Sequence, residues 1–350
     1  MAYRVGVLGA TGAVGSTILE ILAERNFPVS EVVPLASARS AGKKLPFGDG
    51  EVEVVEISEE SIQGLDIVLS SAGGSVSAEW APKIIAAGAV VVDNTSYWRM
   101  DERVPLVVSE VNPDAVAGHQ GLISNPNCTT MVMLTALAPV HRKWGIERLI
   151  VSSYQAVSGT GQKAINELLE QTKAALAGDE VPEPQVYPHR IAFNVLPQVE
   201  TFKDGDDYTT EERKLMAETR KILGETEGSL AISATCARVP VITGHSESIN
   251  IQTREPVEPQ AVRDLLADAP GVIVIDDPGN GLYPLALDAA GNDEVLVGRV
   301  RRDPSHPNCL NLWVVGDNLR KGAALNTVQV AELLVERNLV AVPENTTLAA

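Results

Sequence analysis

The stretch SNPNCTTMVMLTAL places one cysteine, Cys128, between an Asn-Pro-Asn turn and the opening of an apolar helical pattern. A thiol at a helix N-terminus meets the positive end of the helix dipole and unpaired backbone N–H groups, and both stabilise the thiolate. From position alone, Cys128 is either a nucleophile or a small buried core residue. Both interpretations stay open at this point.

The other two cysteines have different surroundings. Cys236 in AISATCARV and Cys309 in NCLNLWVV lie in strand-like segments, which favours ordinary core positions. Three cysteines that are far apart and form no CxxC motif predict neither a disulfide framework nor a metal site. We therefore expect a reducing, cytoplasmic compartment, with Cys128 as the candidate nucleophile.

A nucleophilic cysteine is usually paired with a group that handles protons, and histidine titrates near neutral pH. His245 in RVPVITGHSESINI lies between two predicted strands, next to Gly244 and two residues before Glu247. Surface positions are expected for the remaining histidines, which lie in loops, a turn and a basic helix end: His119, His141, His189 and His306. His245 is the candidate acid/base residue.

A glycine-rich turn, GATGAVG, follows the apolar run YRVGVL and precedes the helical pattern STILEILAERN. Glycines between a strand and a helix let backbone N–H groups approach a pyrophosphate at the helix N-terminus. The spacing GxxGxxG is a variant of the GxGxxG fingerprint, and a turn without a ligand is the alternative. The predicted cofactor-binding residues here are Gly9, Thr11, Gly12, Ala13 and Val14.

The segment after the second predicted strand indicates which dinucleotide binds. In NAD-binding versions an acidic residue about 20 residues beyond the glycines binds the ribose 2′-hydroxyl. Here PLASARSAGKK contains no acidic residue, whereas Ser37, Arg39 and Ser40 offer hydroxyl groups and positive charge to a 2′-phosphate. We predict NADP, with Arg39 as the main discriminator; a solvated basic loop is the alternative.

Apolar runs and helical patterns predict the architecture. Strand-like and helical segments alternate in the first part of the chain, as in a doubly wound parallel sheet of the Rossmann type. Longer strand-like segments follow, such as RLIVSSYQAVS, IAFNVLPQV and CLNLWVVGDN, and predict a mixed α+β domain. A chain of 350 residues is also longer than a domain with a single hydrophobic core usually is.

We therefore expect an α/β protein with two domains. An NADP-binding Rossmann-type domain would occupy residues 1–127 and be joined by a C-terminal helix at about 322–338. A catalytic and dimerisation domain would occupy residues 128–321, and a disordered tail would follow at 341–350.

The charge of the chain restricts its partners. A formal net charge of −18 disfavours nucleic acids and anionic membranes, which the field of the protein would repel. An anionic substrate would need arginine or lysine placed locally. The opening MAYRVGVLGA lacks the features of a signal peptide, and no run of 18 apolar residues occurs, so neither export by that route nor a membrane span is expected.

Taken in order, GATGAVG, SNPNCTT, YQAVSGTGQ, EERK, RVPVITGHSE and GDNLRKGAALN resemble the aspartate-semialdehyde dehydrogenase family over nearly the whole chain. The resemblance implies NADPH-dependent reductive dephosphorylation of L-aspartyl 4-phosphate to L-aspartate 4-semialdehyde through a thioester on Cys128. It implies that His245 is the acid/base partner and that Gln155 orients the acyl group. It also implies a homodimer and a place in the biosynthesis of threonine, methionine and, through diaminopimelate, lysine.

The resemblance further implies a substrate site. Arg238 would grip the substrate carboxylate through a two-pronged guanidinium contact, and Glu211 would hold the ammonium group. Arg99 and Lys214 would bind the phosphate, and Asn127 would position substrate or phosphate. Further residues around the cofactor would be Gly73, Ser158, Gly159 and Asn318.

Two alternatives remain. N-acetyl-gamma-glutamyl-phosphate reductases use the same cysteine chemistry, but their cysteine is typically flanked by glycine and tyrosine, whereas here Asn127 and Thr129 flank it. A catalytically silent NADP-binding protein on the same scaffold is the second alternative. It is disfavoured by the joint presence of Cys128, Gln155, Arg238 and His245.

Overall fold

The computed structural model describes residues 2–348, which form two compact units. Unit 1 contains residues 2–127 and 323–348 of the described chain, and unit 2 contains residues 128–322. Unit 1 is built on a parallel sheet and unit 2 on a mixed sheet, which confirms the predicted α/β class.

The sheet of unit 1 has six strands in the order β5-β2-β1-β6-β7-β8, and all of its strand pairs are parallel. Its strands are β1 (Tyr3–Leu8), β2 (Val29–Ala36), β5 (Val55–Glu56), β6 (Ile67–Ser70), β7 (Val90–Asp93) and β8 (Leu122–Ser124). A separate antiparallel ribbon pairs β3 (Lys44–Phe47) with β4 (Gly50–Glu53). The central strands are continuous apolar runs because helices cover both faces.

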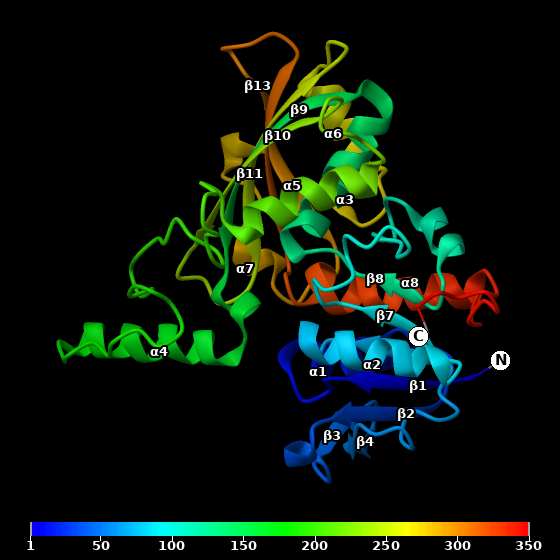
Figure 1. Cartoon of the computed structure of the whole chain (residues 1–350). Coiled ribbons are helices and arrows are strands. Elements are labelled where there is room, and N and C mark those ends of the chain that lie inside the picture. The colour runs from blue at the N-terminus through cyan, green and yellow to red at the C-terminus, as the bar shows by residue number, and fades with distance from the viewer. Residues whose placement is uncertain (1, 349–350) are drawn as a thin grey trace. The chain divides into compact units, whose positions relative to one another are not determined.

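Side chains of the central strand β1 point alternately to the two faces of the sheet, so unit 1 has an apolar core layer on each face. Val5 and Val7 belong to the apolar cluster of α1 (Ala13–Glu24) and α8 (Leu325–Glu336). Leu8 belongs to the opposite cluster, with α2 (Gly74–Ala86). Helices on both faces of a parallel sheet are the doubly wound arrangement that the sequence predicts (Figure 1).

The C-terminal tail, expected to be disordered at 341–350, instead packs on unit 1 as far as Leu348. Leu348 is 3% exposed within the α2 cluster. Thr346 Oγ1 donates to the carbonyl oxygen of Gln120 at 2.6 Å, and Thr347 Oγ1 donates to Gln120 Oε1 at 2.9 Å. One buried leucine and these hydrogen bonds order a terminal segment that was expected to be disordered. Residues 349 and 350 lie outside the described chain.

His119, expected on the surface, is buried in unit 1. Its Nδ1 accepts from the Gly121 N–H at 3.0 Å, and its Nε2 lies 3.1 Å from the carbonyl oxygen of Leu339. Burial lowers the pKa of His119. The neutral ring therefore ties the chain after α8 to the loop before β8.

The sheet of unit 2 has six strands in the order β10-β9-β11-β14-β13-β12. They are β9 (Ile146–Gln155), β10 (Ala231–Arg238), β11 (His245–Thr253), β12 (Val272–Val274), β13 (Val295–Arg302) and β14 (Cys309–Gly316). Pairs β9·β10 and β12·β13 are parallel, and the remaining pairs are antiparallel. The prediction of a mixed second domain is confirmed.

One expected strand, IAFNVLPQV, is irregular. Leu196 forms an isolated bridge with Arg238, but Phe193 and Val195 are 63% and 54% exposed. Ile191, Leu196 and Val199 are buried, so the run packs on unit 2 without forming a regular strand.

Helices α3 (Cys128–Trp144), α5 (Thr210–Leu223) and α6 (Pro259–Ala267) pack on the sheet of unit 2 (Figure 1). His245 faces α3, because a Cβ built on its pairing partner Gly316 would meet Val132 of that helix. Helix α4 (Gln162–Ala177) extends away from this sheet, and α7 (Ala286–Ala289) contacts β14. No helix in residues 2–348 is long and apolar enough to cross a membrane.

Candidate active site

Cys128 is the first residue of α3, as the sequence predicts. It is partly exposed, whereas Cys236 and Cys309 are buried. Burial is the main cause of the raised pKa of both buried thiols. A thiol that stays protonated in an apolar environment is inert, so the structure supports Cys128 as the reactive one of the three.

Gln155, at the end of β9, links the start of α3 to α5. Its side chain is 1% exposed, and its Nε2 donates to Thr129 Oγ1 at 2.7 Å and to Glu211 Oε1 at 3.1 Å. Thr129 directly follows Cys128 in the chain, and Glu211 is itself buried. Three predicted site residues, Cys128, Gln155 and Glu211, are therefore joined by contacts within unit 2.

The backbone of Ala156 joins two further predicted residues. Its N–H donates to His245 Nδ1 at 3.1 Å, and its carbonyl oxygen accepts from Arg238 Nη1 at 2.7 Å. Arg238 also pairs in register with Gln155 at the ends of two parallel strands. Sequence reasoning missed Ala156 because it acts through its main chain and has no distinctive side chain.

His245 is completely buried, and burial followed by the charge of Arg238 holds its pKa well below the usual range. Its Nε2 has no hydrogen-bond partner among the described residues. Gly159 borders this atom: a Cβ added there would lie 3.4 Å from His245 Nε2 and 3.3 Å from Arg238 Nη1. Glycine at this position leaves space beside both side chains.

Glu247 is the next residue of β11 on the same face as His245. Neither of its carboxylate oxygens has a hydrogen-bond partner among residues 2–348, and burial raises its pKa well above the usual value. Burial therefore favours the neutral carboxylic acid of Glu247 over its carboxylate. Its place in the sequence was evident, but its protonation depends on the packing around it.

Arg238 is 5% exposed, and its Nε lacks a partner in the part of the chain that the structure describes. Its guanidinium lies 5.9 Å from the centroid of the Tyr187 ring. Tyr187 comes from the proline-rich segment 178–189, donates its hydroxyl to Thr160 Oγ1 at 3.1 Å, and has a pKa raised by burial. No pattern in the sequence indicates that this tyrosine would reach the site.

Two predicted cofactor residues, Ser158 and Asn318, bond each other. Asn318 Nδ2 donates to Ser158 Oγ at 2.9 Å, and Asn318 Oδ1 accepts from the Gly244 N–H at 3.0 Å. The pair thereby holds the residue that precedes His245. On α5, the predicted phosphate-binding Lys214 forms an ion pair with Glu200.

The glycine turn lies in unit 1, between β1 and α1. Gly9 has φ +86°, and a Cβ there would lie 2.9 Å from the backbone nitrogen of Ala72. A Cβ on Gly15 would lie 2.2 Å from the carbonyl oxygen of Gly9. Gly12 caps α1 without a side-chain hydrogen bond, and the first turn carries no acidic residue. These features fit a dinucleotide pyrophosphate at the helix N-terminus.

The residues predicted for the 2′-phosphate follow β2. Ser37 precedes the 3-10 turn Ala38–Ser40, and both Ser37 and Arg39 are exposed. Within the described residues Arg39 forms no ion pair, so its charge is available to a ligand. Gly73, the N-cap of α2, has φ +98°, a conformation that favours glycine.

Arg99 and Asn127 are both 7% exposed. Arg99 Nη2 donates to the carbonyl oxygen of Asn94 at 3.0 Å, and Asn125 Nδ2 donates to Asn94 Oδ1 at 2.7 Å. Buried asparagines therefore tie the loop of Arg99 to the turn that carries Asn127.

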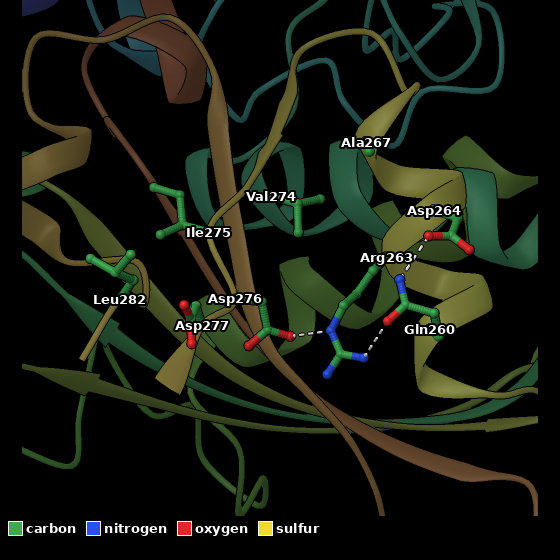
Figure 2. Close-up of a pocket in the computed structure, with 9 residues that line it drawn as sticks. All are labelled: Gln260, Arg263, Asp264, Ala267, Val274, Ile275, Asp276, Asp277 and Leu282. Atoms are coloured by element: carbon green, nitrogen blue, oxygen red, sulfur yellow. Dashed lines mark hydrogen bonds and ion pairs between the residues drawn. The ribbon is translucent and has the colours of Figure 1, made fainter. Parts of the chain in front are cut away.

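A cavity of about 460 Å³ lies elsewhere in unit 2, between α6 and the chain after β12. Figure 2 shows Arg263 reaching from α6 to Asp276, where Nε donates to Oδ2 at 2.6 Å. None of the predicted site residues lines this cavity. Within residues 2–348, no group of three or more His, Cys, Asp or Glu side chains could hold a metal ion.

Comparison with protein families gives two matches. Residues 4–119 match the profile described as "Semialdehyde dehydrogenase, NAD binding domain". Residues 137–321 match "Semialdehyde dehydrogenase, dimerisation domain". Together the two profiles span most of the chain.

Named relatives and solved structures agree with these matches. The chain is 53% identical to an aspartate-semialdehyde dehydrogenase of Aquifex aeolicus over 97% of this chain and 100% of that protein. A solved aspartate semialdehyde dehydrogenase II from Vibrio cholerae, complexed with ASA, superposes with a TM-score of 0.92 at 47% identity, covering 96% of this chain and 99% of that one. A Candida albicans aspartate semialdehyde dehydrogenase solved with NADP has a TM-score of 0.73 at 26% identity, covering 97% of this chain and 100% of that one.

Proposed function

The chain belongs to the semialdehyde dehydrogenase family, and from that premise we propose that it is an aspartate-semialdehyde dehydrogenase. It converts L-aspartyl 4-phosphate to L-aspartate 4-semialdehyde in an NADPH-dependent reductive dephosphorylation. The observation that carries the proposal is the cluster in unit 2 in which Gln155 contacts the residue after Cys128 and the backbone of Ala156 holds Arg238 and His245. The reaction serves the biosynthesis of lysine, threonine and methionine.

Cys128 is the nucleophile. Its sulfur forms a bond to the acyl carbon, the bond from that carbon to the phosphate oxygen breaks, and phosphate leaves with the electron pair. The N-terminus of α3 stabilises the attacking thiolate. NADPH, when bound, supplies the hydride that takes the thioester to the oxidation level of the aldehyde. His245 serves the oxygen and sulfur atoms of these steps as the acid/base partner.

Charged side chains position the substrate. Arg238 holds its carboxylate, Glu211 holds its ammonium group, and Gln155 orients the acyl group. The phosphate is bound by Arg99, Lys214 and Asn127. Lys214 leaves its ion pair with Glu200 to do so. These local cations allow a chain with net charge −18 to bind a dianionic substrate.

NADP binds the turn between β1 and α1. The backbone N–H groups there bind the pyrophosphate, and Arg39 with Ser37 and Ser40 binds the 2′-phosphate. The relative of Candida albicans solved with NADP supports this choice. Gly73, Ser158, Gly159 and Asn318 complete the cofactor site.

Assembly and location follow from the same family. The match of residues 137–321 to a dimerisation domain supports a homodimer. The predicted reducing compartment and the three unlinked cysteines support a cytoplasmic location.

One assay tests the function: phosphate-dependent reduction of NADP with aspartate semialdehyde. We expect activity in the wild type and a loss of at least about 10⁴-fold in Cys128→Ala, because the acyl intermediate cannot form. Cys236→Ala is the matched control and should keep nearly full turnover. Activity that survives in Cys128→Ala would refute the mechanism, and activity with N-acetylglutamate semialdehyde alone would assign the chain to the reductases that use that substrate.

Arg39→Ala tests the cofactor. The ratio of kcat/KM with NADPH to kcat/KM with NADH should fall by about 10-fold or more, because a charge-assisted contact to the 2′-phosphate contributes about 1.5–3 kcal/mol. Lys44→Ala, a nearby exposed cation at the start of β3, is the control and should leave the ratio unchanged. An unchanged ratio in Arg39→Ala would show that Arg39 does not discriminate between the cofactors.

A further inference from the structure

Residues 178–196 follow α4 and reach the sheet of unit 2 beside Arg238. The Leu196 N–H donates to the carbonyl oxygen of Arg238 at 2.9 Å, and the Arg238 N–H donates to the carbonyl oxygen of Leu196 at 2.8 Å. Tyr187, in the same segment, has its ring centroid 5.9 Å from the Arg238 guanidinium. The segment therefore contacts both the main chain and the side chain of Arg238.

Resting on the proposed function, in which Arg238 holds the substrate carboxylate, we propose that Tyr187 is the residue that positions the Arg238 guanidinium for this contact. An aromatic ring attracts a cation that lies over its face within about 6 Å, and the attraction is larger where water is excluded. Arg238 is 5% exposed and Tyr187 is half-buried, so the contact is largely shielded from water. Tyr187 acts through Arg238 and is a positioning residue.

Hydrogen bonds within the protein hold only part of the Arg238 side chain. Nη1 donates to the carbonyl oxygen of Ala156 at 2.7 Å, whereas Nε has no partner among the described residues. The edge that carries Nε is thus left to a carboxylate. A planar group that is fixed at one corner can still turn about its side-chain torsions, and a ring over its face restricts that movement.

Tyr187 is held in place by contacts that do not involve Arg238. Its hydroxyl donates to Thr160 Oγ1 at 3.1 Å, and Thr160 ends the 3-10 turn that follows Ala156. The hydroxyl therefore ties the ring to the part of the chain that binds Arg238. Tyr187 also packs against a buried apolar cluster of unit 2: Val157, Ala164, Leu168, Ile191, Ala192 and Leu196.

Two side chains of α4 fix the backbone on both sides of Tyr187. Before the tyrosine, the N–H groups of Gln185 and Val186 donate to Glu167 Oε2 at 2.6 and 2.7 Å. After it, Gln171 Oε1 accepts two more backbone N–H groups, at 3.1 and 3.3 Å. Both side chains are buried, and hydrogen bonds to a carboxylate are stronger than those between neutral groups. The ring is therefore placed by the segment before any substrate binds.

A second arginine in the same segment contacts an aromatic ring and provides a control. The Arg190 guanidinium lies 5.8 Å from the centroid of the Phe193 ring, nearly the distance found for Arg238 and Tyr187. Phe193 is 63% exposed, and Arg190 Nε donates to a carbonyl oxygen of its own segment. This pair has the same kind of contact without a proposed substrate-binding arginine.

The kinetic constants for aspartate semialdehyde test the role of the ring. Tyr187→Leu removes the ring and keeps an apolar side chain, so KM should rise about 5- to 30-fold while kcat stays nearly unchanged. Tyr187→Phe keeps the ring, and Phe193→Leu alters only the control pair, so both should keep KM within about twofold of the wild type. The KM for NADP should be the same in all of these proteins.

Two kinetic outcomes would overturn the inference. One is an unchanged KM in Tyr187→Leu, and the other is an equal rise in Tyr187→Leu and Tyr187→Phe, because the hydroxyl and not the ring would then act. With an active wild type, either outcome refutes the positioning role and leaves the proposed function standing.

Modification of arginine by phenylglyoxal tests the same role without substrate. The rate at Arg238, followed by mass spectrometry of its peptide, should be at least about threefold higher in Tyr187→Leu, because the ring no longer covers and restrains the guanidinium. Tyr187→Phe and Phe193→Leu should react like the wild type. Equal rates in all four proteins would contradict the inference, whatever the outcome of the aspartate-semialdehyde assay. Urea denaturation monitors folding, and Tyr187→Met replaces Tyr187→Leu in both experiments if the leucine variant does not fold.

Discussion

Two arginines in unit 2 are held in opposite ways. Arg263, beside the cavity of about 460 Å³, donates through Nε to Asp276 Oδ2 at 2.6 Å, and Asp276 also accepts the backbone N–H groups of Arg299 at 2.7 Å and Val300 at 3.0 Å. Around His245, which neighbours Arg238 and lies two residues before Glu247 on β11, the described residues leave several buried polar atoms without partners: Nε of Arg238, Nε2 of His245 and both carboxylate oxygens of Glu247. The protein itself supplies hydrogen-bond partners for the polar groups of the first region, but not for those of the second.

The difference shows which region can recognise a ligand. A buried polar group without a partner costs about 1–3 kcal/mol, so a cluster of them is retained where a ligand supplies the partners. Figure 2 shows the contact of Asp276 with Arg263. Asp276 also accepts the N–H of Arg299, and the neighbouring Asp277 accepts from Asn280. We conclude that the cavity beside Arg263 is a structural feature. The buried atoms without partners around His245 belong to the site that binds the ligand.

Asp276→Asn gives the largest expected change in stability. The substitution leaves the Arg263 charge without its partner and turns one acceptor into a donor that faces N–H groups. We expect the free energy of unfolding to fall by about 3 kcal/mol, since removing one member of a largely buried pair is strongly destabilising. Urea denaturation, followed by the shift of the midpoint, measures this.

The kinetic constants of Asp276→Asn are the control. Both kcat and KM should stay within about twofold of the wild type at temperatures where the variant is folded, because Asp276 touches no proposed site residue. A tenfold rise in KM for aspartate semialdehyde would contradict this interpretation, because it would mean that the cavity takes part in substrate binding.

The matched pair Arg238→Lys and Arg263→Lys gives the next largest effect. A lysine cannot reproduce a two-pronged contact, so Arg238→Lys should raise KM for aspartate semialdehyde about 10- to 100-fold. Arg263→Lys should lower the denaturation midpoint and leave KM unchanged. Steady-state kinetics of both variants, made side by side, measure the contrast. The same KM in both variants would show that Arg238 does not bind the substrate.

Sequence reasoning reached what local patterns determine. The glycine turn, the parallel sheet and the position of Cys128 at a helix start depend on short stretches, and the structure has each of them. Predictions from such patterns were wrong where the burial of side chains determines whether a segment is ordered or forms a strand. IAFNVLPQV has a strand-like composition but pairs only through the bridge of Leu196 with Arg238. Leu348 is buried in a tail that was expected to be disordered.

Some residues of the site could be predicted from local sequence patterns, and others could not. Gln155 and Arg238 end two adjacent parallel strands, and His245, which was expected between two strands, is the first residue of β11. Ala156 could not be identified, because it acts through an N–H and a carbonyl that every residue except proline has. Tyr187 reaches Arg238 from a segment 51 residues earlier in the chain, and no periodicity links them.

Glu247→Gln gives the smallest effect and has the opposite sign to Asp276→Asn. The folded pKa of Glu247 is raised well above 4.5, so the unfolded chain releases this proton at a lower pH than the folded one. Stability is therefore fully present below about pH 4.5 and declines as the pH rises toward the folded pKa. Glutamine matches the shape of the neutral acid and does not titrate, so the variant should avoid that decline.

Thermal unfolding across pH measures this last contrast. We expect Tm of Glu247→Gln to equal that of the wild type near pH 4.5 and to exceed it at pH 8. Asp276→Asn should instead lower Tm at pH 8. If Glu247→Gln lowers Tm by the same amount at every pH, then Glu247 is ionised and paired in the folded protein. The unsatisfied cluster around His245 would then resemble the satisfied pair around Arg263, and burial without partners would not distinguish the two regions.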